Sequence, residues 1–371
     1  MLVIIIINQI INPSYEIISK HCDAIRIQEH YMNNLSAYYL LQTKRVHPEI
    51  FEYKIVNNRA CENNNSAVDL LIFITSNTRS YERRNAIRRT YGNLNNIFKY
   101  SDNALARLEV RILFMINLDG NRMKTVLYEQ EIFNDIVQGN LKVLIPDYDS
   151  MNIYRDLSIL DWSSKYCSQA RFIFKMNDSV FLNPFLLLKF INENPNDRFN
   201  LELKDSINIS DSCAHINARL PLLSGFIHSN ENVLRQKLST NQQSENFLVN
   251  KDEYPCDTYP NYLNDNAYLI SNDARDLILS TFYRQSKILF PISNIYITGI
   301  LPEYLHIERH SLINYKINFN SEISCEEFFI ETNPLQAFAC VINIDLSKNI
   351  FEYYSIYWQS IINSQIENNE K

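Results

Sequence analysis

Residues 70–92 read LLIFITSNTRSYERRNAIRRTYG. The first five residues form a continuous apolar run, which is typical of a strand buried on both faces of a parallel sheet. A charged segment with helical spacing follows over residues 80–91, and Gly92 is the kind of residue at which helices end. This stretch therefore predicts a buried strand followed directly by a helix.

The same alternation continues along the chain. Two further buried strands are expected at residues 110–116 (VRILFMI) and 171–176 (RFIFKM). Helices are expected over 121–137 and about 153–166 and, after short strands and loops at 221–268, over 272–281. Alternating strands and helices predict an α/β fold with a mostly parallel central sheet flanked by helices.

Composition excludes several classes of protein. Of the 371 residues, 46% are hydrophobic, which can fill a sizeable core and excludes intrinsic disorder for the chain as a whole. The 35 basic and 42 acidic side chains give a net charge of −7, which argues against a dedicated nucleic-acid-binding protein. None of the five glycines lies in a Rossmann or P-loop fingerprint.

The seven cysteines leave two interpretations open. They include no CxxC pair, which argues against a zinc ribbon or a thioredoxin-type redox site. Their wide spacing fits a few disulfides in an oxidising compartment, with one thiol left over, and equally fits buried free thiols in a cytosolic protein. Sequons at Asn34, Asn64 and Asn208 would permit glycosylation in the secretory pathway.

Three segments are expected from the distribution of residue types. Residues 1–65 are irregular and polar and are expected to form a stem or linker, 66–350 the main domain, and 351–371 a C-terminal tail. The apolar start, residues 1–7 (MLVIIII), breaks at Asn8. It is shorter than the roughly 20 residues of a spanning helix and lacks the basic residues that precede the apolar part of a signal peptide.

Five arginines lie within eleven positions of an acidic chain: Arg79, Arg83, Arg84, Arg88 and Arg89. Arg84 and Arg88 are i,i+4 neighbours and share a helix face. Guanidinium groups match the geometry of phosphate and stay charged, so a phosphate-bearing ligand is one interpretation. A solvated helix face is the other.

Polar residues also follow the strand at 171–176. Residues 175–181 read KMNDSVF, and the carboxyl ends of parallel strands are where such sheets bind ligands. Asp178 offers one carboxylate to a divalent cation, and the alternative is an ordinary turn. Further along, Tyr262 and Tyr268 belong to a tyrosine-rich segment that either stacks on a sugar or a base or packs in the core.

Taken in order, these segments resemble glycosyltransferase family 31, the β-1,3-galactosyltransferases and β-1,3-N-acetylglucosaminyltransferases. The family's R-x-A-I-R-x-T-W-G signature is met by residues 84–92 (RNAIRRTYG), with Tyr91 in place of tryptophan. Its tryptophan five residues before a cysteine is met by Trp162 and Cys167. Its YPPY turn, with Y-x-x-S after it, and its acidic segment before Thr-Gly are similar to 259–271 and 293–299. The resemblance covers roughly residues 66–315.

The resemblance implies a GT-A-like nucleotide-sugar-binding fold. It implies inverting transfer of galactose or N-acetylglucosamine from a UDP-sugar, in β-1,3 linkage, to a glycan acceptor on a glycoprotein or glycolipid. It also implies Mn²⁺ as cofactor, held by Asp178, and a lumenal domain at the Golgi membrane. The residues it assigns to the nucleotide sugar are Arg79, Arg84, Arg88, Asn177, Asp178 and Tyr262.

The chain departs from the family at two chemical positions. The acidic triplet reads Asn177-Asp178-Ser179, which keeps only its middle carboxylate, and the acidic pair that contains the general base reads Ser293-Asn294. An amide cannot take a proton from a hydroxyl at neutral pH, so Asn294 marks the catalytic position without its chemistry.

Other residues would have to replace the missing groups if the chain is an enzyme. The candidates by sequence are Asp265 and Glu303 for the base, and His306 or His310 beside Asp178 for the metal. The second hypothesis is a non-catalytic family member that binds a glycan or partners an active transferase. The third is a drifting gene copy whose product folds without a selected role.

Overall fold

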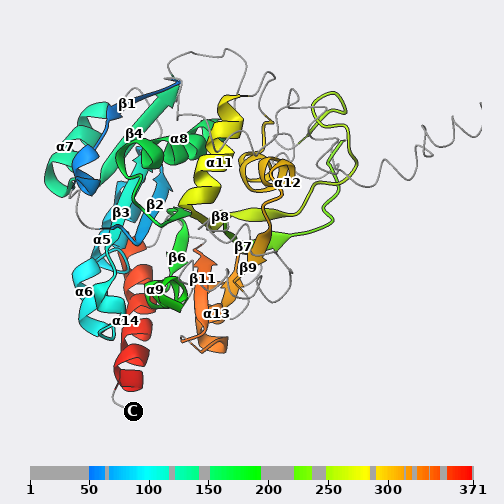
Figure 1. The fold of residues 1–371 in the computed structure, drawn as a ribbon. Coiled ribbons are helices and arrows are strands. Elements are labelled where there is room, and N and C mark those ends of the chain that lie inside the picture. The colour runs from blue at the N-terminus through cyan, green and yellow to red at the C-terminus, as the bar shows by residue number, and fades with distance from the viewer. Residues whose placement is uncertain are drawn as a thin grey trace, which may run out of the picture.

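The computed structural model describes residues 50–62, 67–116, 122–141, 151–193, 221–235, 248–284, 290–312, 315–319, 324–333, 335–342 and 349–369. A central sheet lies between two layers of helices (Figure 1). This is the arrangement expected of a GT-A-like α/β domain, and the predicted fold class is confirmed. The sequons at Asn34, Asn64 and Asn208 and the apolar start lie outside the described residues.

The described residues form a large sheet of eight strands. Its order is β1 (Phe51–Ile55), β4 (Ile136–Leu141), β3 (Val110–Ile116), β2 (Leu70–Ser76), β5 (Phe172–Asn177), β8 (Tyr262–Ser271), β7 (Leu223–His228) and β9 (Arg309–Ser311). The run β4-β3-β2-β5 is parallel, whereas β1, β8 and β7 pair antiparallel to β4, β5 and β8. The three buried strands expected from the apolar runs are confirmed as β2, β3 and β5.

Strand β2 is central because both of its faces are apolar. Leu71 and Phe73 pack into the core on one side of the sheet, and Leu70, Ile72 and Ile74 pack into the core on the other. Each is at most 4% exposed. Burying an aliphatic or aromatic side chain of this size is worth about 1.5–3 kcal/mol, so this strand stabilises both layers at once.

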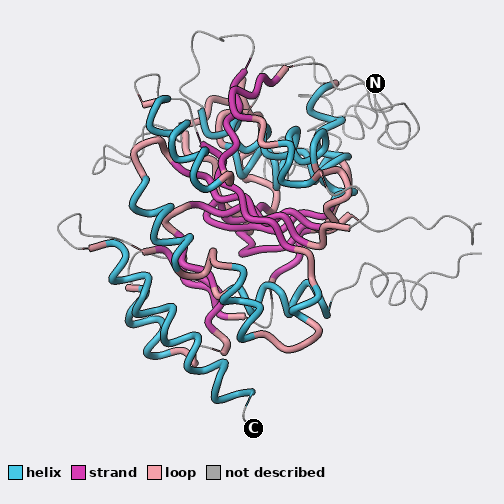
Figure 2. Tube along the Cα trace, turned by 90° about the vertical axis from the view of Figure 1, so that its left-hand side faces the viewer, coloured by secondary structure: helices cyan, strands magenta, loops and turns pink. Residues whose placement is uncertain are grey.

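Helices cover both faces, as Figure 2 shows with the strands layered between them. One face packs against α8 (Met151–Tyr166), α11 (Asn272–Tyr283), the π-helix η5 (Ile295–Ile300) and α12 (Leu301–Tyr304). The other packs against α5 (Tyr81–Arg89), α6 (Leu94–Tyr100), α7 (Met123–Phe133), α9 (Pro184–Glu193), α13 (Cys325–Glu331) and α14 (Ile350–Asn369). Short 3₁₀ turns are η1 (Asn58–Cys61) and η2 (Leu105–Arg107). Among the described helices, none is long and apolar enough to cross a bilayer.

The helix expected over 121–137 ends early. Helix α7 stops at Phe133 because Asn134 takes a left-handed conformation with φ 51°, which terminates helices. Strand β4 then begins at Ile136, in a stretch that the prediction had assigned to the helix.

The folded unit is wider than the expected 66–350 domain. Residues 51–55, expected within the stem, form β1 and pair with β4. Residues 350–369, expected mostly as a tail, form α14, whose buried Tyr354 and Trp358 belong to the same core as β2. A second sheet of β10 (Lys316–Asn318), β11 (Ala337–Val341) and β6 (Val180–Leu182) lies in this core as well.

Disulfides decide between the two interpretations of the cysteines at the described positions. Cys61 is bonded to Cys167 and Cys325 to Cys340, and Cys256 is disulfide-bonded too. The first bond ties the segment before β2 to the end of α8, and the second ties α13 to β11.

The two fully described disulfides should differ in their contribution to stability. Cys61 and Cys167 are 106 positions apart, whereas Cys325 and Cys340 are 15 apart. A longer loop restrains the unfolded chain more, about 4.7 kcal/mol for 100 residues against about 3 kcal/mol for 15. We expect the Cys61→Ala/Cys167→Ala pair of substitutions to lower the free energy of unfolding more than Cys325→Ala/Cys340→Ala, measured by denaturant titration. An equal loss from both pairs would contradict the loop-length argument.

Candidate functional site

The carboxyl ends of β2 and β5 meet the amino end of β8 at one edge of the large sheet, because β2 and β5 are parallel and β8 runs antiparallel to β5. We call this edge, with the residues that directly follow β2 and β5, the carboxyl edge. Open α/β sheets bind ligands there. Asn177 and Asp178 lie on it, at the end of β5.

Asp178 is held firmly. Its Oδ2 accepts a hydrogen bond from the Ser76 hydroxyl at 2.7 Å, and its Oδ1 pairs with Nη1 of Arg83 at 3.3 Å. Its backbone N–H donates to the Thr75 carbonyl at 3.0 Å, and its carbonyl accepts from the Tyr354 hydroxyl at 2.8 Å. Only 8% of the residue is exposed. Contacts from β2 and α5 therefore fix the carboxylate, and contacts from β2 and α14 fix its backbone.

Tyr91, which replaces the family's tryptophan, supports the segment after Asp178. Its hydroxyl donates to the Val180 carbonyl at 2.7 Å, and its ring packs edge-on against Phe181 with centroids 5.2 Å apart. Burial raises the pKa of the Tyr91 phenol well above its usual value, so the hydroxyl keeps its proton and remains a donor. Tyr91 therefore holds this segment by one hydrogen bond and one ring contact.

Arg84 is buried within the protein. Its Nε and Nη2 donate to the two carboxylate oxygens of Glu129 on α7 at 2.8 and 2.7 Å. Its Nη1 donates to the Ser76 hydroxyl at 3.0 Å and to the Asn77 carbonyl. Since Ser76 in turn donates to Asp178, Arg84 helps to orient the Asp178 carboxylate through Ser76.

Arg88 has the same kind of environment. It donates a bidentate pair of hydrogen bonds to the Asp135 carboxylate at 2.7 and 2.8 Å and forms an ion pair with Glu129 at 2.8 Å. Its guanidinium lies over the rings of Phe114 and Phe133. Nucleotide binding by Arg84 and Arg88 stays a prediction, and so does that of Arg79, which has partners of its own. The contacts described here give Arg84 and Arg88 a structural role.

A chain of charged groups links β5 to α8 and β8. The buried Lys175 ammonium donates to Asp265 Oδ1 at 2.6 Å and lies 3.6 Å from Asp156 Oδ2, which accepts from the Ser293 hydroxyl at 2.6 Å. The Asp265 side chain is 37% exposed. Burial acts to raise the pKa of Asp265, but the charge and hydrogen bond of Lys175 outweigh it and hold the pKa below its usual range. Asp265 is therefore ionised at neutral pH.

Asn294 has a structural role. Its side-chain amide donates to the Leu263 carbonyl at 3.2 Å, and its own backbone carbonyl accepts from the Thr298 hydroxyl. Thr298 also accepts from the Leu263 N–H at 2.9 Å. Hydrogen bonds to Leu263 thus hold residues 294–298, which include the family's base position, against the start of β8.

Tyr262 is the first residue of β8 and directly precedes Leu263. It stacks on His228 with ring centroids 4.9 Å apart, and a Cβ on Gly299 would come within 3.0 Å of its Cβ. Glycine at position 299 therefore permits the close approach of η5 to β8. Burial raises the pKa of Tyr262 to about 12, and the Glu231 carboxylate adds to the shift. Binding of a nucleotide sugar by Tyr262 stays a prediction, as it does for Asn177.

The donor set at Asp178 does not fit a divalent cation. Both of its carboxylate oxygens have partners already, one of them a cation. His310 lies on β9, three strand spacings or about 14 Å from β5, and His306 lies in the turn before β9. Among the described residues, no group of three or more His, Cys, Asp or Glu side chains could hold a metal. The Mn²⁺ expected from the resemblance stays a prediction.

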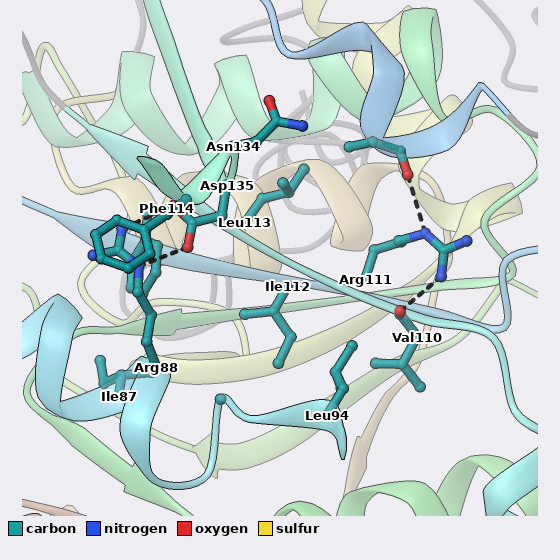
Figure 3. A pocket seen from close by; sticks show the side chains of 13 residues that line it. Ile87, Arg88, Leu94, Val110, Arg111, Ile112, Leu113, Phe114, Asn134 and Asp135 are labelled. Carbon is teal, nitrogen blue, oxygen red and sulfur yellow. Dashed lines mark hydrogen bonds and ion pairs between the residues drawn. The ribbon is translucent and has the colours of Figure 1, made fainter. Parts of the chain in front are cut away.

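A pocket of about 290 Å³ lies away from Asp178 (Figure 3). It opens beside the first half of β3 and is lined by apolar side chains such as Leu94 and Ile112, together with Arg88 and Asp135. Of the residues assigned to the nucleotide sugar, Arg88 is the one among its described lining residues. We therefore treat the carboxyl edge, and not this pocket, as the candidate site.

The galactosyltransferase family model matches residues 82–313, which is more than half of the chain. The chain belongs to the galactosyltransferase family. The matched range contains Asp178, Asp265 and Asn294 and spans the carboxyl edge except the end of β2 and residues 77–81 after it. The resemblance to glycosyltransferase family 31 is thereby confirmed.

Curated relatives of this galactosyltransferase domain are distant. A lactosylceramide 1,3-N-acetyl-β-D-glucosaminyltransferase of Xenopus tropicalis is 23% identical, over 68% of this chain and 60% of that protein. The Rattus norvegicus protein of that name is 26% identical, over 59% and 49%, and β-1,3-galactosyltransferase 1 of Mus musculus is 25% identical, over 65% and 62%. The chain thus spans about half to three-fifths of these relatives' lengths. A solved glycosyltransferase involved in glycosylation of the PBCV-1 major capsid has a TM-score of 0.32 at 10% identity, over 78% of this chain and 99% of that one.

Arg83 and Lys175 are not identified as site residues by the sequence patterns. Helical spacing favours Arg84 and Arg88 because they share a helix face, but that face turns inward to Glu129. Arg83, one position earlier, is the arginine that reaches Asp178. The signal for Lys175 was present as a charge inside an otherwise apolar strand, a position that needs a buried counter-charge.

Glu129 should contribute stability that depends on pH. Burial acts to raise its pKa, but the hydrogen bonds and charges of Arg84 and Arg88 outweigh it and lower the pKa from the ordinary value of 4.5. This contribution is therefore complete above about pH 4.5 and is lost as the pH falls through the lowered value. We expect Glu129→Gln to lower the free energy of unfolding at pH 7 by about 3 kcal/mol, because two buried cations lose a counter-charge.

Glu131, which is exposed on the same helix, provides the matched control. Glu131→Gln makes the same charge change and should alter the free energy of unfolding by less than about 0.5 kcal/mol. Denaturant titrations between pH 3 and pH 7 would test both variants. A Glu129→Gln protein as stable as the control at pH 7 would show that the buried pairs contribute nothing.

Asn294→Asp would restore the family's residue type but should destabilise the protein. A carboxylate cannot donate to the Leu263 carbonyl, so this acceptor loses the Asn294 donor and keeps the longer contact from the Thr298 hydroxyl at 3.5 Å, at a cost of about 1 kcal/mol. Thermal unfolding of Asn294→Asp beside Asn294→Ala would test this. If the aspartate variant is as stable as the parent, the Leu263 contact does not matter.

Proposed function

We propose that this galactosyltransferase family member transfers galactose or N-acetylglucosamine from a UDP-sugar to a glycan on a glycoprotein or glycolipid, in β-1,3 linkage. The observation that carries the proposal is the fixed Asp178 carboxylate at the end of β5, inside the matched family domain. The names of the relatives, which include β-1,3-galactosyltransferase and 1,3-N-acetylglucosaminyltransferase, support the sugar and the linkage.

The transfer requires a base that is not Asn294, and we assign this role to Asp265. Its carboxylate is ionised and partly exposed. Asp265 also lies near the end of β5, because Ala267, two positions later on β8, pairs with Met176 of β5. As an acceptor hydroxyl forms its bond to the anomeric carbon, the bond from that carbon to UDP breaks and its electron pair leaves with UDP. The hydroxyl proton passes to Asp265, and the configuration at the carbon inverts.

The proposal predicts a specific effect of Asp265→Asn. It should lower the turnover of UDP-galactose or UDP-N-acetylglucosamine about 10²- to 10⁴-fold while UDP binds as before, because the proton acceptor is lost whereas Lys175 keeps Asp156 as a counter-charge. Glu303→Gln is the matched control: it makes the same carboxylate-to-amide change at the other base candidate, whose carboxylate is also paired with a cation, Arg309 at 2.5 Å. Transfer to galactose- and N-acetylglucosamine-terminated acceptors gives the readout. Full activity of Asp265→Asn would remove Asp265 from the mechanism.

A second candidate function is supported by the amide of Asn294. Its hydrogen bond to Leu263 uses the family's base position for structure, as a non-catalytic member that binds glycan or partners an active transferase would permit. In that case the wild-type protein binds UDP, yet neither transfers nor hydrolyses either UDP-sugar. A positive transfer assay would exclude this candidate.

We propose the lumen of the Golgi apparatus as the compartment, at the membrane where transferases of this family typically reside. The disulfides Cys61–Cys167 and Cys325–Cys340 support an oxidising compartment, because cytosolic thiols are kept reduced.

A further inference from the structure

Arg83 lies on α5 with its guanidinium against the Asp178 carboxylate. Nη1 of Arg83 is 3.3 Å from Oδ1 of Asp178, and 26% of the Arg83 side chain is exposed. Within the part of the chain that the structure describes, Arg83 makes no other hydrogen bond or ion pair. Its Nε and Nη2 therefore keep N–H groups that can donate to a ligand at the carboxyl edge.

Asp178 is arranged to hold a guanidinium. Its Oδ2 receives the Ser76 hydroxyl hydrogen, because the Ser76 oxygen itself accepts from Arg84 Nη1 at 3.0 Å and so directs its hydrogen toward Asp178. Its Oδ1 faces the positive charge of Arg83. A divalent cation that approached Oδ1 would meet a like charge, and it would find neither oxygen without a partner.

We propose that Arg83 binds the diphosphate of the UDP-sugar directly, and that this donor binds the chain without a divalent cation. The inference rests on the proposed function, since it concerns the same donor. A guanidinium presents paired N–H groups in a planar fork that matches two phosphate oxygens. Arg83 then supplies the positive charge at the position where the family places a metal, and Asp178 is the positioning residue that orients it.

Calorimetric titration of the full chain with UDP, in EDTA and separately in MnCl₂, tests the proposal. We expect the dissociation constants in the two buffers to agree within about threefold. Arg83→Ala should weaken binding roughly 10- to 100-fold in both buffers, the range for loss of a charged hydrogen bond. Arg83→Lys should bind with intermediate affinity, because it keeps the charge without the fork.

Two further variants complete the experiment. Arg107→Ala removes the same charge from an exposed position in η2 and should leave UDP affinity unchanged. Asp178→Asn removes the only carboxylate of the degenerate triplet, and it should weaken UDP binding by less than Arg83→Ala does and leave the binding resistant to EDTA. Circular dichroism of each variant confirms that it is folded.

The outcomes separate this inference from the proposed function. If wild-type binding requires MnCl₂ and is lost in Asp178→Asn, the donor is bound through a metal: the inference is overturned and the proposed function stands. If Arg83→Ala and Arg107→Ala both bind UDP like the wild type in EDTA, Arg83 is not a ligand and the inference is again overturned. If the folded wild type binds no UDP in either buffer, the proposed function and the inference both fail.

Discussion

The buried ion pair between Arg84 and Glu129 organises the carboxyl edge, where the candidate site lies. Glu129 is 2% exposed and receives two hydrogen bonds from Arg84 and one ion pair from Arg88. The remaining Arg84 nitrogen donates to the Ser76 hydroxyl and the Asn77 carbonyl, where the chain leaves β2. Helix α5, helix α7 and the end of β2 are thereby joined by a single pair of side chains.

The cost of that burial explains why the contacts continue outward. An uncompensated ion inside a protein is penalised by several kcal/mol, so each charge must meet another or a hydrogen-bond partner. Arg84 forms an ion pair with Glu129, and Ser76 accepts a hydrogen bond from Arg84 and donates one to Asp178. Asp178 in turn forms an ion pair with the partly exposed Arg83. On the other side of the sheet, Lys175 connects Asp156 and Asp265 in the same manner. The position of Asp178 is thus set by a connected series of hydrogen bonds and ion pairs that begins at the buried Glu129.

The sequence predicts those features that depend on neighbours along the chain. Apolar runs located β2, β3 and β5, and the polar residues that follow the third run lie at the carboxyl edge. Features that depend on partners far away along the chain cannot be predicted from local sequence patterns. The partner of Arg84 is 45 positions away and that of Lys175 is 90 positions away, so helical spacing identified a shared face of α5 without showing that it faces inward.

Helix α14 is similarly hard to predict, because only its packing on α5 and β6 distinguishes it from a polar tail. The Tyr354 hydroxyl lies 176 positions after the Asp178 carbonyl to which it donates. At about 5–20 residues per second, synthesis needs roughly 10–35 s to pass from one to the other. The nascent chain therefore carries an Asp178 loop without its last support for that interval, and the carboxyl edge is completed only when the final helix has been made.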